Sequence, residues 1–209
     1  KQSITASSFD AWTKFYQQGP DAVNNIVSYY AKGALIALWL DLTIRSKSNN
    51  QYSLDTLMRE LWIHFGRTST GTTEEDFINI ANLLCGEDIS SAFTHHLYSS
   101  ERIDLSHELA NYGVQLQKQK FKKLNSLETT SATHYHAYLG AQYKAQTLGL
   151  TITQVLENSP AASAGLAVND ILIAIDNIKT TEQSIQAIFD HLPADSKLTC
   201  HFFRDDQLL

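Results

Sequence analysis

The spacing of apolar residues changes once along the sequence, and this change limits the possible folds more than any other feature. Up to about residue 117, apolar residues recur at the three- and four-residue spacing of amphipathic helices. From about residue 134, short apolar runs alternate with turn residues, which is typical of β-structure. We therefore expect a multidomain chain, α followed by α+β, with a helical domain at 1–117, a linker at 118–133 and a small β-rich domain at 134–209.

Composition excludes several classes of protein. The 209 residues suit two small domains. The 16 Lys and Arg residues face 22 Asp and Glu residues without forming a basic stripe, which argues against nucleic-acid binding. The longest apolar run, 34–40, is too short to span a bilayer, so we expect no membrane segment. Cys85 and Cys200 lie far apart, which predicts neither a disulfide framework nor a cysteine zinc site. The compartment stays open, with the cytoplasm slightly preferred.

Five helices are expected in the first part, joined by short connections that favour a compact bundle. One covers Ile26–Arg45, and the others begin near Ser53, Thr73, Asp88 and Asp104. Apolar residues at helical spacing in the first of them are expected to form its buried stripe: Ile26, Tyr30, Ala34, Ala37, Leu38 and Leu42.

The second part predicts a small barrel-like sheet with two helices. Strands are expected after Tyr138-Leu139-Gly140-Ala141 and at 150–156, 171–175 and 198–203, and helices are expected to begin at Ser159-Pro160 and Thr181-Glu182. The last residues look like the start of a further strand. We therefore expect a fragment cut at both ends, with an incomplete final hairpin whose open edge could pair with a neighbouring chain.

No complete catalytic centre is recognisable. A zinc peptidase helix needs two histidines four residues apart, with a glutamate after the first. His107-Glu108 is followed by Asn111 where the second histidine would stand, so this pair is not such a motif. His134 and His136 would share one face of a strand and could hold a metal, although ordinary surface histidines are the simpler interpretation. We therefore expect no metal ligands in this chain.

The segment Ser28–Leu35 contains a glycine early in a long helix, which costs about 1 kcal/mol relative to alanine. In one interpretation, Tyr29 and Tyr30 simply pack and Lys32 is solvated. In the other, Gly33 permits close packing against a neighbour, or one phenol is held in a set position. The spacing alone leaves both open.

Several motifs together resemble the glycyl aminopeptidases, the gluzincin-like metallopeptidase family M61. The resemblance covers about residues 7–117. It rests on Ser8-Phe9-Asp10-Ala11-Trp12 with Lys14 and Tyr16, on Ser28-Tyr29-Tyr30-x-Lys32-Gly33-Ala34, on Leu40-Asp41-Leu42-x-Ile44-Arg45, and on Ser53-Leu54-Asp55 with the residues that follow to Gly66. That family carries a PDZ domain after its peptidase domain. Independently, Tyr138–Ala141 resembles a PDZ carboxylate-binding loop, and Ser159–Ile175 resembles the core signature of a PDZ domain.

The resemblance implies the helical C-terminal part of a thermolysin-like peptidase domain that removes N-terminal glycine or small residues from peptides. Tyr30 matches the tyrosine that donates a hydrogen bond to the oxyanion of the tetrahedral intermediate. Its neighbour Tyr29 is one helical step of about 100° away and is expected to face elsewhere. The zinc ligands and the catalytic glutamate would precede Lys1. The chain alone is therefore expected to be inactive and to bind no catalytic zinc, which would belong to the full-length enzyme.

The PDZ resemblance implies that an extended peptide adds to a sheet edge, with its terminal carboxylate held by backbone amides. The candidate peptide-binding residues are Leu139, Gly140, Ala141, Ile185 and Ile188. The two isoleucines could instead pack in the core, because a groove-facing and a core-facing isoleucine look alike in sequence. The expected ligand is a peptide or protein C-terminus with an apolar last residue.

A second interpretation from another class also fits the sequence. A non-enzymatic adaptor could combine a helical bundle and a PDZ domain that only bind partners such as peptide C-termini. A zinc-ligand motif in the sequence before Lys1 would distinguish the enzyme from the adaptor.

Overall fold

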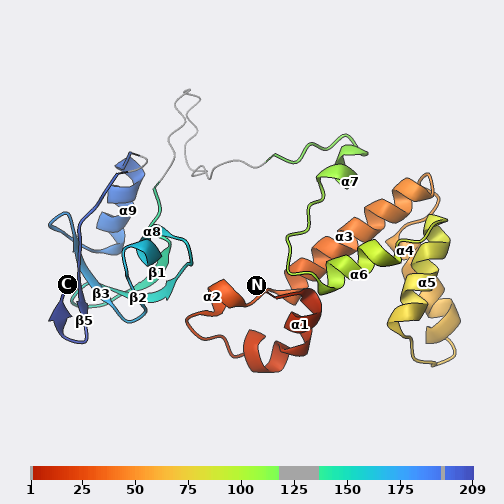
Figure 1. Cartoon of the computed structure of the whole chain (residues 1–209), viewed down its shortest axis with the longest axis horizontal. Coiled ribbons are helices and arrows are strands. Elements are labelled where there is room, and N and C mark those ends of the chain that lie inside the picture. The colour runs from red at the N-terminus through yellow and green to blue at the C-terminus, as the bar shows by residue number, and fades with distance from the viewer. Residues whose placement is uncertain (1, 118–136, 194–195) are drawn as a thin grey trace. The chain divides into compact units, whose positions relative to one another are not determined.

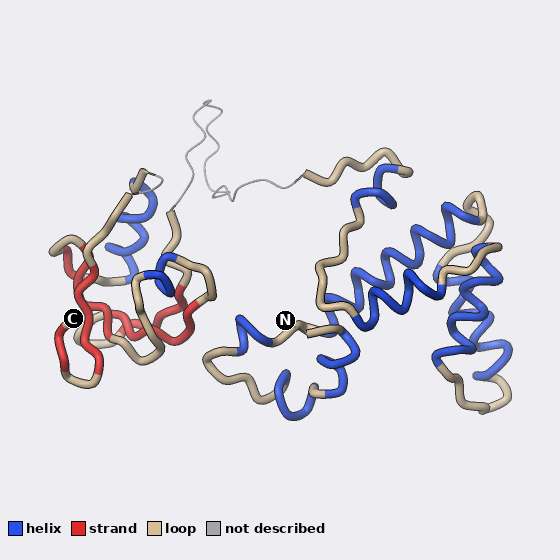
Figure 2. Tube along the Cα trace, viewed as in Figure 1, coloured by secondary structure: helices blue, strands red, loops and turns tan. Residues whose placement is uncertain are grey.

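The computed structural model describes residues 2–117, 137–193 and 196–209 (Figure 1). The chain forms two compact units, of which the first contains residues 1–17 and 25–117 and the second contains residues 18–24 and 118–209. The first unit is helical, and the second is an antiparallel sheet with short helices (Figure 2). The predicted fold class is confirmed. The predicted linker at 118–133, together with His134 and His136, lies outside the described residues, and the proposed domain limits remain a prediction.

The described helices of the first part include the five that were predicted. In chain order the elements are α1 (Ile4–Phe9), η1 (Ala11–Phe15), α2 (Ala22–Asn25), α3 (Tyr29–Lys47), α4 (Leu54–Leu61), η2 (Trp62–Gly66), α5 (Glu74–Cys85), α6 (Ser90–Tyr98) and α7 (Ser106–Ala110). Both η1 and η2 are single-turn π-helices. Helix α3 begins three residues later than expected because the Ser28 hydroxyl caps it, accepting a hydrogen bond from the Ala31 amide at 3.2 Å.

Helix α3 supplies the centre of the helical core, but not with the predicted face. Leu40 and Ile44 are buried together with Leu57 of α4, whereas Tyr30 and Leu38 of the predicted stripe are exposed. The predicted stripe is therefore wrong. The helix carries apolar residues on almost every side, so its periodicity did not single out one face. The contacts of Lys32 with Ser99 and of Gly33 with Ile4, in the first turns of the helix, decide which face is buried.

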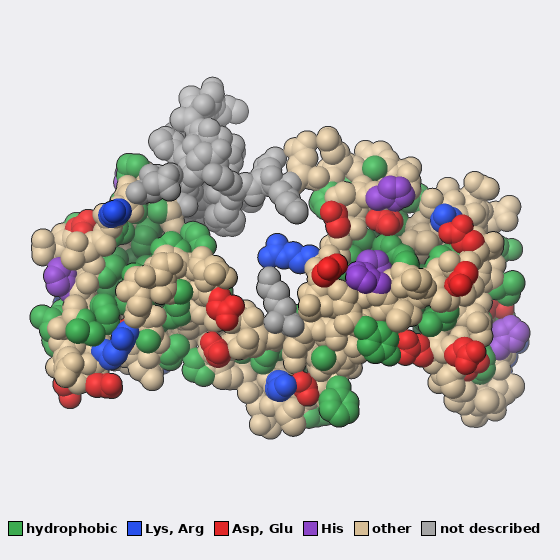
Figure 3. Space-filling model, in the orientation of Figure 1, with side chains coloured by type: hydrophobic (Ala, Val, Ile, Leu, Met, Phe, Trp, Pro, Cys, Tyr) green, Lys and Arg blue, Asp and Glu red, His purple; other side chains and the backbone are tan. Residues whose placement is uncertain are grey.

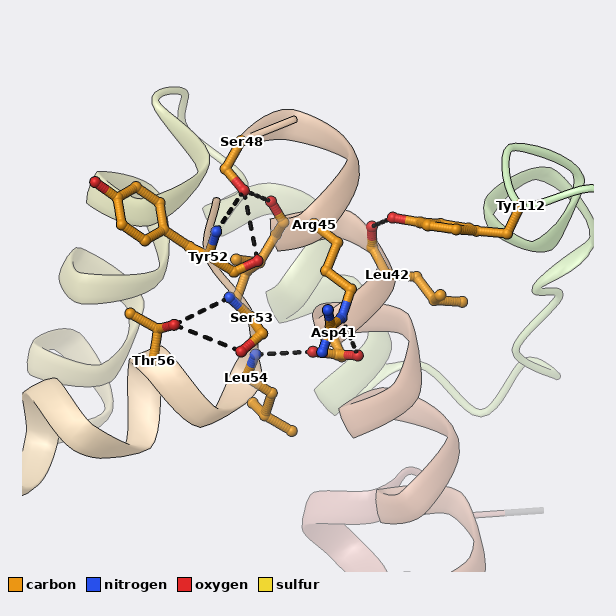
Figure 4. A network of polar contacts seen from close by, with 10 residues as sticks. Asp41, Leu42, Arg45, Ser48, Tyr52, Ser53, Leu54, Thr56 and Tyr112 are labelled. Atoms are coloured by element: carbon orange, nitrogen blue, oxygen red, sulfur yellow. Dashed lines mark hydrogen bonds and ion pairs between the residues drawn. The ribbon is translucent and has the colours of Figure 1, made fainter. Parts of the chain in front are cut away.

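The junction between α3 and α4 is held by a polar network (Figure 4). One Asp41 carboxylate oxygen accepts a hydrogen bond from the Leu54 amide at 2.8 Å, and the other accepts one from Arg45 Nε at 2.8 Å. Asp41 thus satisfies an amide at the positive N-terminal end of α4 while it is paired with a cation on its own helix. The Tyr112 hydroxyl donates to the Leu42 carbonyl at 3.2 Å, which fastens the chain after α7 to the same helix.

The second unit is built on one antiparallel sheet. Its described elements are β1 (Ala141–Ala145), β2 (Leu150–Val155), α8 (Pro160–Ser163), β3 (Ile171–Ile175), β4 (Ile178–Lys179), α9 (Glu182–His191), β5 (Cys200–Arg204) and β6 (Gln207–Leu208). The strand order is β1-β2-β3-β5-β6, and β4 pairs with β3. The end of the chain, where an interrupted hairpin was expected, forms β6 against β5.

The core of the sheet lies between β2, β3 and α9. Leu150, Leu172, Ile175 and Ile185 are fully or almost fully buried there. Ser159 caps α8 by accepting a hydrogen bond from the Ala162 amide at 3.2 Å, and Pro160 occupies the first helical position, as the sequence predicted.

An ion pair between a buried carboxylate and a half-exposed arginine joins the start of β3 to the end of β5. Arg204 binds both carboxylate oxygens of Asp170, with Nε–Oδ1 and Nη2–Oδ2 distances of 2.8 and 2.7 Å, and its Nη2 also donates to the Gly165 carbonyl at 2.7 Å. Asp170 is 1% exposed. Burial by itself raises the pKa of this carboxyl, but the hydrogen bonds from Arg204 and from the Ala167 amide outweigh it, so the pKa lies below its ordinary value.

Replacing the cation should destabilise the second unit. In Arg204→Met the buried Asp170 carboxylate loses its partner, and we expect a loss of about 3 kcal/mol at neutral pH. A depressed pKa stabilises the fold above the ordinary carboxyl pKa of 3.8, and this contribution disappears as the pH falls through the lower native value. The gap between variant and wild type should therefore shrink at acid pH. Denaturant unfolding followed by NMR resonances of β3 measures both effects, and a difference below about 0.5 kcal/mol at neutral pH contradicts the assignment.

The surface shows no strongly charged region on the face drawn in Figure 3, where acidic and basic side chains are interspersed. Within the described ranges, no helix combines the length and apolar character required to cross a bilayer.

Candidate functional site

The first turns of α3 are anchored by a buried lysine. Lys32 is only 8% exposed, and its Nζ donates to the Ser99 carbonyl at 2.7 Å. Ser99 caps the C-terminal end of α6, where exposed carbonyls favour a cation. Burial nevertheless lowers the pKa of Lys32. The interpretation in which this lysine is solvated is therefore wrong.

Gly33 lets α3 approach α1 closely. A Cβ at this position would lie 3.2 Å from Ile4 Cδ1, tighter than an ordinary contact. The glycine early in the helix thus has the packing role that the second interpretation expected. Because Lys32 and Gly33 face α6 and α1, the side chain of Tyr30 is directed to another side of the helix.

Tyr30 lies in a cluster of phenols at the surface. Its side chain is 62% exposed, and its hydroxyl is 3.0 Å from the Tyr16 hydroxyl, which is in turn 2.9 Å from the Tyr29 hydroxyl. The rings of Tyr29 and Tyr30 are 4.3 Å apart, and Phe15 packs against both. The expectation that Tyr29 faces elsewhere is wrong. At the first turn of a helix no preceding turn separates the two side chains, so both reach Tyr16.

The shared hydrogen bonds shift the pKa values of Tyr29 and Tyr30 in opposite directions. The hydrogen bonds with Tyr16 and then Tyr29 lower the pKa of Tyr30, whereas those with Tyr16 and Tyr30 raise the pKa of Tyr29. A phenol with a lowered pKa is a stronger hydrogen-bond donor. Of the hydroxyls of Tyr29 and Tyr30, that of Tyr30 is therefore better suited to donate to an oxygen that gains negative charge.

Removing the Tyr16 hydroxyl should weaken this effect. In Tyr16→Phe we expect the pKa of Tyr30 to rise toward its ordinary value of 10.0, because the largest cause of the depression is lost. A pH titration of ¹³Cζ-tyrosine resonances measures it, and Tyr98→Phe on α6 serves as the control. An unchanged Tyr30 titration in Tyr16→Phe would show that the phenols are not coupled.

A second candidate site lies in the sheet unit. A cavity of about 340 Å³ is bounded by Leu139, Gly140 and Ala141, by β1, and by Gln186 and Phe189 of α9. Three of the five predicted peptide-binding residues therefore come together here.

Neither isoleucine proposed for the groove lines this cavity. Ile185 is completely buried in the core beside Leu150, Leu172 and Ile175, and Ile188 packs against the same cluster. Their assignment to the groove is corrected to core packing. From the same helix, Gln186 and Phe189 line the cavity, and Phe189 also packs against the core cluster.

The loop at one end of the cavity has a fixed conformation. Gly140 has φ +76°, and a Cβ there would lie 2.2 Å from the Cβ of Ser159, so only glycine fits. Its carbonyl accepts from the Leu156 amide at 2.8 Å, and the Leu139 carbonyl accepts from the Ala161 amide at 2.9 Å. These bonds fix the loop at one end of the cavity, and its role in binding a carboxylate stays a prediction.

Sequence reasoning missed one part of this cavity. Val23, which belongs to the second unit, lines it, and the neighbouring Asn24 binds the backbone at Val155 and Glu157. No local signal in the sequence connects residues 131 positions apart, so an analysis of spacing and composition could not find this contact.

A larger cavity of about 630 Å³ lies in the helical unit and is lined by His95, His96, His107 and Glu108 among others. Over the described residues, no three His, Cys, Asp or Glu side chains gather closely enough to hold a metal ion. The zinc ion that the family resemblance implies therefore does not fit the described part of this chain.

Comparisons with known proteins match both parts of the chain. Residues 1–36 match the M61 glycyl aminopeptidase family, and residues 151–199 match the PDZ domain. An aminopeptidase N family protein from Idiomarina loihiensis is 44% identical in a match that covers all of this chain, with a TM-score of 0.85. The chain is a relative of the M61 glycyl aminopeptidases. It spans 36% of the length of the Idiomarina protein.

Two further comparisons add little to the M61 relationship. The HtrA-type protease AlgW, solved with a decapeptide, is 23% identical over 35% of this chain and 27% of its own, and its TM-score of 0.32 is too low to support an argument. No curated protein matches the chain.

Proposed function

We propose that this chain is the C-terminal part of a zinc-dependent aminopeptidase, in which Tyr30 stabilises the oxyanion of the transition state. The observation that carries the proposal is an exposed phenol on α3, hydrogen-bonded to Tyr16, in a chain that resembles an aminopeptidase along its whole length. By resemblance to the M61 family, the substrates are peptides with N-terminal glycine or another small residue.

The chemical role follows from the properties of Tyr30. When a peptide carbonyl is attacked, its oxygen gains negative charge, and a donor held at about 2.7–3.1 Å from that oxygen lowers the barrier. Tyr30 is held by Tyr16 and Phe15 and has a lowered pKa, so its O–H is oriented and acidic before substrate arrives. The zinc ion and the general base would come from residues outside this chain, which we therefore expect to be inactive by itself.

The sheet unit has a separate role in this proposal. Its cavity would hold the C-terminal end of a peptide or protein, with the carboxylate at the loop Leu139–Ala141 and the last side chain against Phe189. The support comes from the PDZ match and from the neutral lining of the cavity, where none of the described residues carries a formal charge. Such a lining favours an apolar last residue.

Replacing Tyr30 by phenylalanine in the full-length protein tests the enzymatic role. Loss of one oxyanion donor should lower kcat by roughly 10²–10³-fold, with little change in KM or thermal stability. Hydrolysis of glycyl p-nitroanilide gives both constants. Tyr98→Phe, which removes an exposed hydroxyl from α6 of the same unit, should keep normal turnover.

Two outcomes would contradict the proposal. A kcat of Tyr30→Phe within about twofold of the wild type would remove this residue from the mechanism. A full-length protein that binds peptide C-termini but hydrolyses no aminoacyl substrate would instead support the adaptor.

A further inference from the structure

A segment from the first part of the sequence belongs to the sheet unit. Residues 18–24 are grouped with the sheet unit, whose described residues begin at 137, although the chain on both sides of them is part of the helical unit. The segment contains Gly19 and Pro20 and ends in α2. Within it, Ala22 is buried, Asn24 is half-buried and Val23 is 41% exposed.

Asn24 attaches this segment to the end of β2 with two hydrogen bonds. Its Nδ2 donates to the Val155 carbonyl at 2.8 Å, and its Oδ1 accepts from the Glu157 amide at 2.9 Å. One carboxamide thus presents a donor and an acceptor side by side, as the backbone of a paired strand does. The residue after Val155 is Leu156, which binds the Gly140 carbonyl, so the segment is fastened beside the loop that bounds the cavity.

Val23 is placed at the cavity by this attachment. It lines the same space as Leu139, Leu156 and Phe189, and the remaining volume of about 340 Å³ is open. Val23 therefore forms a wall of the cavity without filling it. Three glutamines, Gln142, Gln154 and Gln186, also line the space and offer donors and acceptors without charge.

We propose that Val23 and Asn24 complete the peptide-binding cavity, so that the apolar last side chain of a bound peptide C-terminus contacts Val23. This proposal rests on the proposed peptide-binding role of the sheet unit and adds a specificity-determining residue to it. Apolar walls from three separate parts of the sequence, at Val23, Leu139 and Phe189, then surround that side chain.

Titration with one defined probe tests the proposal. The probe is acetyl-Ala-Ala-Ala-Ala-Val with a free carboxylate, and its C-terminal amide is the control ligand. Replacing an apolar contact by a polar one in Val23→Ser should weaken binding about tenfold, and Asn24→Ala should weaken it similarly by releasing the segment. Gln18→Ala, an exposed position in the same segment, should bind like the wild type.

Hydrogen exchange of the Glu157 amide tests the attachment of the segment independently of peptide binding. In Asn24→Ala, the Glu157 amide loses its acceptor and should exchange faster, whereas Asn24→Asp keeps an acceptor oxygen and should keep the protection. Unchanged Glu157 exchange in Asn24→Ala would overturn the docking of the segment.

The remaining outcomes distinguish the two proposals. If the wild type binds the acid better than the amide, but Val23→Ser binds within twofold of the wild type, the cavity binds peptides without Val23 and only this inference fails. Tighter binding by Val23→Ser would mean that the segment competes with the peptide, which also overturns it. If the wild type binds neither ligand, the proposed peptide-binding role fails with it.

Discussion

The buried ammonium of Lys32 donates to the Ser99 carbonyl at the end of α6, and beside it Gly33 admits Ile4 of α1. Together these contacts set the rotation of α3 about its own axis. A different rotation would turn Tyr30 into the bundle, where its hydroxyl could reach neither Tyr16 nor a substrate. A buried cation and a glycine within a helix both cost folding free energy. In this structure, the same two residues determine where the exposed phenol of Tyr30 lies.

The two candidate sites use different physical principles. At the phenol cluster, hydrogen bonds between neutral groups lower the pKa of Tyr30. In the proposed function, this prepares a donor for charge that develops only during the reaction. In the sheet unit, the cavity has a neutral lining and a loop whose conformation depends on Gly140, which suits recognition of a peptide end without chemistry. The segment 18–24 follows Tyr16 and carries Val23, so it joins the two sites along the chain.

Much of the fold was predictable because its signals are local. Thr73 and Ser159 cap the helices that follow them, as expected, and β3 was predicted with the observed limits of Ile171–Ile175. The buried face of α3 was not predictable, because its apolar residues surround the helix and the deciding contact is Lys32 with a carbonyl 67 residues away.

In the two candidate sites, the sequence identified some of the residues but not the contacts that they make. Tyr30 and the loop around Gly140 stood out through a motif, and each lies where a ligand could reach it. Ile185 could not be assigned, since core and groove isoleucines share one pattern. Val23 carried no signal, because its role comes from contacts with residues distant in sequence. Tyr16 belonged to a family motif, but nothing in that motif indicated its hydrogen bond with Tyr30.

A crystal structure of the full-length protein with a phosphinic dipeptide analogue tests the central claim most directly, because the phosphinyl oxygens imitate the tetrahedral intermediate. The account predicts the Tyr30 hydroxyl at about 2.7–3.1 Å from one of these oxygens. A bound analogue with no polar atom within hydrogen-bond distance of Tyr30 would contradict it.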